Sequence, residues 1–103
     1  MLLVIDVGNT NTVLGVYEGS RLLHHFRVES ARGRTSDEFT VTIRALLEHR
    51  GIDPQAISAS ALACVVPSLA ETFTRVVRTA FNHDPMVVGP GVKTGMPILY
   101  EQP

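Results

Sequence analysis

The opening stretch of the chain constrains its fold more than any other segment. An apolar run over residues 2–5 leads directly to Asp6, and a turn rich in Gly, Asn and Thr follows over residues 8–12. A continuous apolar run that is bounded by turn residues is typical of a β-strand buried on both faces. The sequence therefore predicts a buried strand that brings one carboxylate to the edge of a sheet.

The turn after Asp6 has the composition of a phosphate-binding hollow. Gly8 lacks a Cβ, so backbone can approach a ligand closely there, and residues 9–12 add amides, hydroxyls and main-chain N–H groups. Such a concavity suits a phosphate, and the carboxylate suits the Mg²⁺ that accompanies nucleotide phosphates. Residues 8–17 also suit an ordinary hairpin, because Gly-Asn is a hairpin signal and residues 13–17 read as a returning strand. Both interpretations stay open from these residues alone.

Composition excludes several classes of protein. The 103 residues suffice for one domain with a modest core, and a chain with 45% hydrophobic and 18% charged residues is globular. The net charge of −1 gives no general attraction to nucleic acid or to an anionic membrane. No apolar stretch is long enough to cross a bilayer, and no basic leader precedes the first strand. The single cysteine, Cys64, lies in an apolar run and is expected to be a buried, reduced thiol.

The pattern of apolar residues and turn signals predicts the order β-β-β-α-β-α-β, with the strand within 57–66, whose small residues are weak strand formers, predicted from its context. Three strands joined by short turns form an antiparallel meander, and the strand–helix–strand unit that follows favours a parallel crossover. The predicted fold class is α/β, a mixed sheet with helices on its faces. We expect a strand ending at Asp6, strands over 12–17 and 21–28, a helix from 35 to about 50, a strand within 57–66, a helix over 69–82 and a strand over 86–88.

Both helices carry the sequence signature of a capping box at their start. Thr35 precedes Glu38 by three residues, and Ser68 precedes Glu71 by the same spacing. In this motif, side chains satisfy the first free N–H groups of a helix. Gly51 is the expected C-terminal stop of the first helix.

Two groups of polar residues resemble ligand sites at first sight. His24 and His25 are adjacent on a strand and therefore point to opposite faces, so we expect one half-buried and one solvated histidine. Arg27, Arg32 and Arg34 could reach a phosphate or an acidic partner. Nearby acidic residues offset these charges, which favours a solvated loop.

Parallel strands place their carboxyl ends at one edge of the sheet, where ligands gather. Asp6, the end of the strand that contains Cys64, the following Pro67-Ser68 and residues 89–91 are therefore expected to be neighbours on that edge.

Several motifs together resemble the type III pantothenate kinases. They are Asp6-Val7-Gly8-Asn9-Thr10-Asn11-Thr12, Arg34-Thr35-Ser36-Asp37-Glu38, Val65-Val66-Pro67-Ser68 and the segment from Val87 to Ile98. Separate motifs in the order of the family are more specific than one glycine turn. The resemblance extends over the whole chain but over only about the first half of a family member, so we expect residues 1–103 to be a single N-terminal ATPase-type domain.

The resemblance implies one half of a ribonuclease-H-like, actin-like ATPase fold. It implies ATP-dependent phosphorylation of pantothenate to 4′-phosphopantothenate, the first step toward coenzyme A, in a cytoplasmic homodimer that uses Mg²⁺ and a monovalent cation, K⁺ or NH₄⁺. The implied ATP-binding residues are Asp6, Val7, Gly8, Asn9, Thr10, Asn11, Thr12 and Val13, with Asp6 also at the metal. The implied pantothenate-binding residues are Tyr100, Gly89 and Gly95.

The family pattern also has parts that lie beyond Pro103. A Gly-Ala-Asp-Arg motif supplies the aspartate base, and a second Asp-Gly-Thr-type motif binds the monovalent cation. No catalytic base is therefore assigned here, and we expect these residues alone not to turn over at a useful rate. One alternative is a non-catalytic accessory or regulatory protein that retains the nucleotide-binding half. Another is a ribonuclease-H-like nuclease, which needs several carboxylates for two metals and would have to use Glu38 and Glu48.

Overall fold

The computed structural model describes residues 1–88. Its elements are β1 (Leu2–Val7), β2 (Asn11–Glu18), β3 (Arg21–Glu29), α1 (Ser36–His49), the short 3₁₀ helix η1 (Pro54–Ala56), β4 (Ala59–Cys64), α2 (Pro67–Phe81) and β5 (Met86–Val88). The predicted order β-β-β-α-β-α-β is confirmed, with η1 as the one addition within the described part of the chain.

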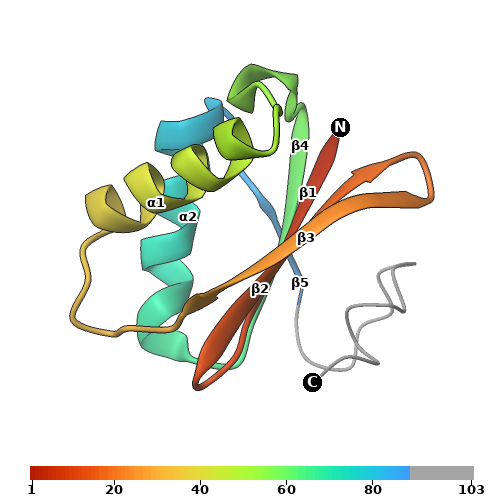
Figure 1. Ribbon diagram of the computed structural model, residues 1–103. Helices are drawn as coiled ribbons and strands as arrows, with labels where there is room; N and C mark the ends of the chain where they lie inside the picture. Colours follow the sequence, from red (N-terminus) through yellow and green to blue (C-terminus); the bar gives the residue numbers. More distant parts are fainter. Residues whose placement is uncertain (89–103) are drawn as a thin grey trace.

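The five strands form one mixed sheet in the order β3-β2-β1-β4-β5 (Figure 1). The first three strands pair antiparallel as the predicted meander, whereas β1 with β4 and β4 with β5 are parallel. The register pairs Val7 with Cys64 and Ala63 with Val88. The carboxyl ends of the three parallel strands therefore lie level at one edge of the sheet, as expected for Asp6 and the end of the Cys64 strand. Residues 89–91, which are expected at the same edge, lie outside the described residues.

Both helices cover the same face of the sheet (Figure 1). Alternate residues of β1, namely Leu3, Ile5 and Val7, are completely buried in the core on this side. Phe39 of α1 packs against Phe73 of α2, with 4.8 Å between the ring centroids. Each large apolar side chain that is removed from water contributes about 1.5–3 kcal/mol. This core fixes the position of β1, the strand that carries the candidate carboxylate.

The start of α1 has the predicted capping box. The Thr35 hydroxyl accepts the Glu38 N–H at 3.1 Å, and the Glu38 carboxylate accepts the Thr35 N–H at 2.8 Å. The Glu38 carboxylate accepts hydrogen bonds from the Thr35 N–H and from the Thr35 hydroxyl, and these two bonds lower the pKa of the carboxyl group. Gly51 follows the helix with φ +77°, a left-handed conformation that favours glycine, so the predicted stop is confirmed as well.

The capping box predicted for α2 is wrong. The helix begins at Pro67, its N-cap is Val66, and no side chain caps it. Proline suits the first helical position because its fixed φ matches the helix and its missing N–H leaves no donor unsatisfied. Ser68 therefore lies within the first turn, one residue past the start, where it cannot act as the cap.

The sequence also predicts how deeply two histidines and the cysteine are buried. His24 is half-buried and His25 is exposed, as predicted from their adjacency on a strand. Cys64 is free, but it is only half-buried, so the expectation of a buried thiol is wrong. It is the last residue of β4, at the edge of the sheet, and its thiol donates to the Val66 carbonyl oxygen at 2.9 Å.

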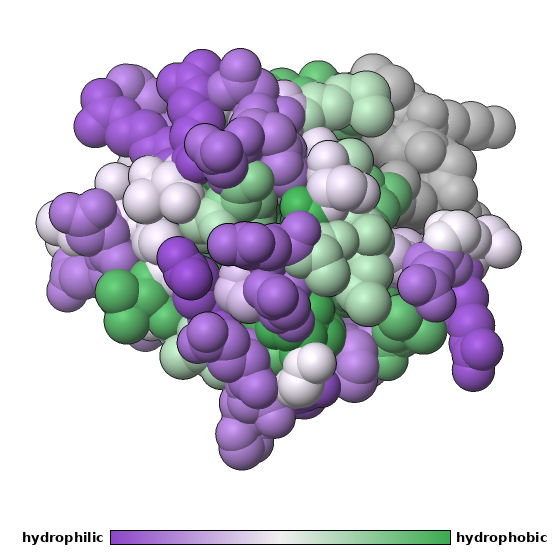
Figure 2. Space-filling model, turned by 90° about the horizontal axis from the view of Figure 1, so that it is seen from above, coloured by the Kyte–Doolittle hydropathy of each residue, from purple (hydrophilic) through white to green (hydrophobic). Residues whose placement is uncertain are grey.

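The amino-terminal end of β1 is held by the chain itself. The Met1 amine donates to the Ala56 carbonyl oxygen at 2.8 Å, and the Ser58 N–H donates to the Met1 carbonyl oxygen at 2.9 Å. Seen from above, this end of the molecule shows hydrophilic side chains over most of its surface, with smaller hydrophobic groups between them (Figure 2). Within residues 1–88, no helix is both long and apolar enough to span a membrane.

Candidate functional site

The candidate site lies where β1 ends and turns into β2. In Figure 1 this turn lies at the lower end of the molecule, beside the start of α2. Asp6 has Val13 and Ala63 as its register neighbours on the two flanking strands. Because side chains alternate along a strand, Asp6 points to the face opposite the helices, which cover Ile5 and Val7.

The Asp6 carboxyl group is half-buried, and this burial raises its pKa. Within the described residues no ion pair involves Asp6. Its negative charge also raises the pKa of the Cys64 thiol, although burial of that thiol is the larger cause. A partly desolvated carboxylate without a cationic partner is a group that a bound divalent cation would stabilise.

The turn itself closes by a short backbone contact. The Gly8 N–H donates to the Asn11 carbonyl oxygen at 3.0 Å, and a Cβ at position 8 would lie only 2.9 Å from that oxygen. Gly8 is thus required by the approach of the chain to itself. The hairpin interpretation is correct for the backbone, since β1 and β2 are antiparallel neighbours. A hairpin whose tip carries Asn and Thr can still present polar groups to a ligand.

The predicted turn residues do not all face the same surroundings. Asn9, Thr10 and Asn11 are exposed at the tip, whereas Val7 and Thr12 are completely buried. The Thr12 hydroxyl is hydrogen-bonded to the Ser30 hydroxyl at 2.8 Å inside the protein. Val13 is half-buried on β2. The exposed tip is therefore the part of the motif that can contact a ligand through side chains, and Thr12 holds the base of the turn.

The connection between β3 and α1 packs against this turn, which sequence reasoning did not foresee. The Ser30 N–H donates to the Thr10 carbonyl oxygen at 2.8 Å. The Arg32 guanidinium (Nη2) donates to the Asn9 side-chain oxygen at 3.3 Å. Arg32 is exposed, as the solvated-loop prediction has it, but it touches the turn. The one sequence signal for this contact is the cluster of arginines in the connection.

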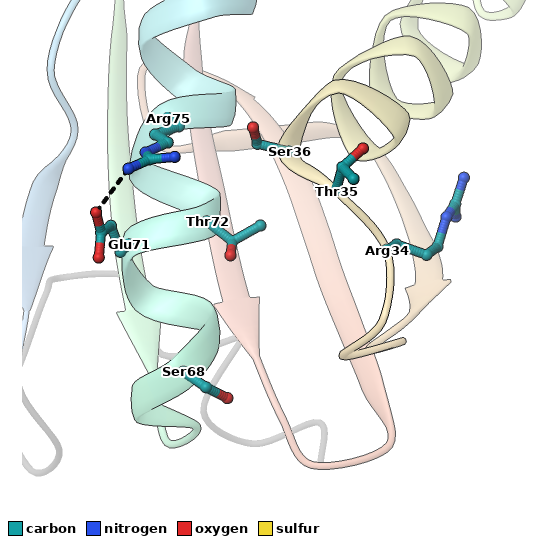
Figure 3. Close-up of a pocket in the computed structure, with 7 residues that line it drawn as sticks. All are labelled: Arg34, Thr35, Ser36, Ser68, Glu71, Thr72 and Arg75. Carbon is teal, nitrogen blue, oxygen red and sulfur yellow. Dashed lines mark hydrogen bonds and ion pairs between the residues drawn. The ribbon is translucent and has the colours of Figure 1, made fainter.

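Arg34, two residues further on, is used differently. Its guanidinium donates to the Thr42 hydroxyl at 2.8 Å and lies 5.1 Å from the centre of the Phe39 ring. Both contacts are to α1, so Arg34 stabilises the amino-terminal half of this helix. In Figure 3 its side chain extends away from α2.

A pocket of about 340 Å³ lies between the start of α1 and the amino-terminal half of α2 (Figure 3). Its lining is polar, and includes the ion pair of Glu71 with Arg75, at 2.9 Å, on α2. The lining residues are Arg34, Thr35, Ser36, Ser68, Glu71, Thr72 and Arg75. No residue of the turn at Gly8 contributes to it, so the pocket and the turn are separate features.

Residues 1–88 contain no group of three or more His, Cys, Asp or Glu side chains that could hold a metal ion together. The Glu38 carboxylate is engaged in the capping box of α1, and Glu48 is exposed near the other end of that helix. These residues therefore do not provide the convergent carboxylates that a two-metal nuclease needs. A single carboxylate is nevertheless sufficient for Mg²⁺ that arrives with a nucleotide, because phosphate oxygens and waters complete its shell. Gly89, Gly95 and Tyr100, the predicted pantothenate-binding residues, lie outside the described residues.

Comparison with solved structures defines the fold class. The ROK hexokinase from Thermus thermophilus matches 85% of this chain and 33% of that chain, with a TM-score of 0.63 at 16% identity. RuvC from Thermus thermophilus matches 86% of this chain and 61% of that chain, with a TM-score of 0.53 at 25% identity. The described residues thus form a mixed α/β sheet of the ribonuclease-H-like, actin-like ATPase class, which includes sugar kinases.

Comparison of sequences is more specific. A family model described as "Type III pantothenate kinase" matches residues 2–103. A type III pantothenate kinase from Myxococcus xanthus is 56% identical over all 103 residues, and the chain spans 40% of the length of that relative. The chain belongs to the type III pantothenate kinase family, as the resemblance of its motifs predicts.

Proposed function

We propose that this chain is the ATP-phosphate-binding part of an enzyme that phosphorylates pantothenate to 4′-phosphopantothenate, the first step of coenzyme A biosynthesis. In this proposal residues 1–103 form a single N-terminal ATPase-type domain. The observation that carries the proposal is the position of Asp6. It lies at the carboxyl ends of the parallel strands, beside an exposed turn of polar residues, in a chain of the type III pantothenate kinase family.

The residues of the turn have distinct tasks in this proposal. Asp6 holds Mg²⁺ directly or through water, and its half-buried carboxylate, which has no ion-pair partner within residues 1–88, fits that cation. The exposed amides and hydroxyls of residues 9–11 and the backbone of Gly8 surround the phosphates of ATP. The backbone of the turn is held in position by the residues at its base, which are the buried Val7 and Thr12 and the half-buried Val13. Magnesium neutralises part of the charge that develops on the phosphoryl group in transfer.

Other parts of the proposal depend on the family alone. Tyr100, Gly89 and Gly95 would bind pantothenate, and a monovalent cation, K⁺ or NH₄⁺, would assist nucleotide binding. The aspartate base would come from a segment that follows residue 103 in the relatives. We also propose that the complete enzyme is a cytoplasmic homodimer. Catalysis of phosphoryl transfer rests mainly on positioning and on charge stabilisation, so the two halves of the site have to act together.

The substitution Asp6→Asn tests the metal role. In a full-length protein that contains this chain, we expect kcat/KM for pantothenate phosphorylation by MgATP to fall by about 10²–10³-fold, because the carboxylate ligand that would hold the charge-stabilising Mg²⁺ is lost. Asp37→Asn, the same change at an exposed position of α1, is the matched control and should alter the rate by less than about threefold. Full activity of the Asp6→Asn protein would contradict the assignment.

The catalytic activity of the isolated 103-residue chain is a second test of the proposed function. We expect it to lack useful turnover, since the loss of acid–base assistance alone costs about 10²–10⁴-fold. Rapid phosphorylation of pantothenate by the chain alone would show that the site is complete without a second half. A full-length protein that binds MgATP but never phosphorylates pantothenate would favour the accessory or regulatory alternative.

A further inference from the structure

The proposed phosphate-binding turn carries no positive charge of its own. Residues 6–13 contain one carboxylate, Asp6, and no Lys or Arg. ATP with one bound Mg²⁺ keeps a net negative charge of about two, and proteins that bind such groups commonly supply a guanidinium or ammonium group. A cationic side chain from a neighbouring segment would complement the charge of a phosphate bound at the turn.

The connection between β3 and α1 is fixed to the turn at two points. Ser30 donates its N–H to the Thr10 carbonyl oxygen at 2.8 Å, and its hydroxyl is bonded to the buried Thr12 hydroxyl at 2.8 Å. Both Ser30 and Thr12 are buried, so water does not compete for the bond between their hydroxyl groups. The backbone of the connection thus has a defined position next to the turn.

Arg32 follows this anchor by two residues and reaches the tip of the turn. Its guanidinium group donates to the Asn9 side-chain oxygen at 3.3 Å. The side chain is exposed, and a guanidinium has five N–H donors. One long hydrogen bond therefore leaves most of its donors available to a ligand at the tip.

The neighbouring arginines are less suited to this task. Arg34 is bound to Thr42 and lies over Phe39 on α1. Arg27 lies on β3 in register with Val13, so β2 separates it from Asp6. Of the arginines in and beside the connection, Arg32 is the one whose guanidinium contacts the turn.

We propose that Arg32 is a polyphosphate-binding residue, which complements Asp6 and its Mg²⁺ from the other side of the turn. The guanidinium would exchange its bond with Asn9 for charge-assisted hydrogen bonds to phosphate oxygens. Ser30 and Thr12 are positioning residues that hold the connection in place. This inference rests on the proposed function, because it requires that the turn binds phosphate.

The experiment measures binding by calorimetry to a full-length protein that contains this chain. The probes are MgATP, magnesium tripolyphosphate and pantothenate. We expect Arg32→Gln to raise the Kd of both phosphate compounds about tenfold or more, and to leave the Kd of pantothenate unchanged. Arg32→Lys should recover part of the loss, because it keeps the charge but not the planar fork. Arg44→Gln, at an exposed position of α1, is the matched control.

The outcomes separate this inference from the proposed function. If Asp6→Asn weakens MgATP binding and Arg32→Gln changes it by less than twofold, Arg32 is not a phosphate ligand although the turn is the nucleotide site. If neither variant changes MgATP binding, the proposed function itself fails. Equal losses for pantothenate and for the phosphate compounds would show a general structural effect and would also overturn the role of Arg32. Thermal unfolding of each variant confirms that it is folded.

Discussion

Asp6 lies half-buried at the end of β1, and within residues 1–88 its carboxylate forms no ion pair. The alternating residues Ile5 and Val7 are completely buried under the helices, and Val13 and Ala63 flank Asp6 on the neighbouring strands. Burial raises the pKa of this carboxyl group because the charged form loses solvation. Asp6, the proposed Mg²⁺ ligand, therefore lowers the free energy of unfolding when it is ionised and no cation is bound.

Removal of the Asp6 charge is therefore expected to stabilise the protein, by an amount that depends on pH. An Asp whose pKa is higher in the folded state than in the unfolded state binds its proton more tightly when folded, so ionisation destabilises the fold as pH rises. We expect Asp6→Asn, without Mg²⁺ or nucleotide, to raise the free energy of unfolding at pH 7. The difference in the free energy of unfolding should shrink as pH falls and disappear below 3.8, the ordinary pKa of an aspartate, which applies to the unfolded chain.

Urea unfolding at several pH values measures this difference, with Glu18→Gln, an exposed change at the end of β2, as the control. Added MgATP should stabilise the parent protein and not Asp6→Asn. An Asp6→Asn protein that is less stable than its parent at pH 7 would show that the carboxylate has a stabilising partner in the folded state.

At the scale of single residues, the sequence predicts the position of the Asp6 carboxylate but not which distant residues contact the turn beside it. The position of Asp6 follows from an apolar run that ends in one acidic residue. The contact of Ser30 with Thr12 and that of Arg32 with Asn9 join residues about twenty positions apart. They depend on the length and register of β2 and β3, which no local pattern encodes.

The hairpin of β1 and β2 is the element on which the site depends. Its turn is narrow because the Gly8 N–H reaches the Asn11 carbonyl oxygen, and a Cβ at position 8 would lie 2.9 Å from that oxygen. The obstacle is backbone, which cannot rotate away as a flexible side chain could. Glycine is thus a requirement of the turn whether or not a phosphate binds.

The short distance to the Asn11 carbonyl oxygen predicts that a methyl group added at position 8 destabilises the fold. We expect Gly8→Ala to reduce the free energy of unfolding by about 1–3 kcal/mol, the usual range for overpacking, and to weaken MgATP binding as the turn shifts. Gly33→Ala is the matched control, because a Cβ there meets nothing within 4 Å and its φ is not left-handed. That change should be neutral or stabilise the protein by up to about 1 kcal/mol. Equal stabilities of the two variants, from chemical unfolding, would refute a tight turn at Gly8.

The two helix starts show why local signals differ in reliability. For α1, Thr35 and Glu38 make the full capping box that their spacing predicts. For α2, the Ser68–Glu71 pair has the same spacing, but Pro67 one residue earlier starts the helix. A proline at the first helical position is a start signal that outweighs the capping pattern. The start of each helix is therefore set by its most restrictive residue, whereas the order of the elements followed from apolar patterns, turn signals and, for β4, the context of its neighbours.

At the scale of the whole molecule, the order β3-β2-β1-β4-β5 makes β5 an edge strand of the sheet that residues 1–88 form. Met86 and Val87 of this strand are 64% and 61% exposed. An edge strand with unpaired backbone groups and exposed apolar side chains can pair with another chain. The parallel crossover that creates this edge was predictable from the strand–helix–strand pattern, but its exposure depends on the tertiary arrangement.

We therefore expect the chain of 103 residues to self-associate in isolation, in a manner that depends on β5. Val87→Lys should reduce this association, because a charged side chain on an edge strand opposes pairing with a second copy. Val41→Lys is the matched control, since Val41 is 69% exposed but lies on α1, where no strand edge is available. Size-exclusion chromatography with light scattering, over a range of concentrations, measures the mass of each protein. A parent chain that stays monomeric throughout, or a Val41→Lys change that reduces association as much as Val87→Lys, would exclude pairing through β5.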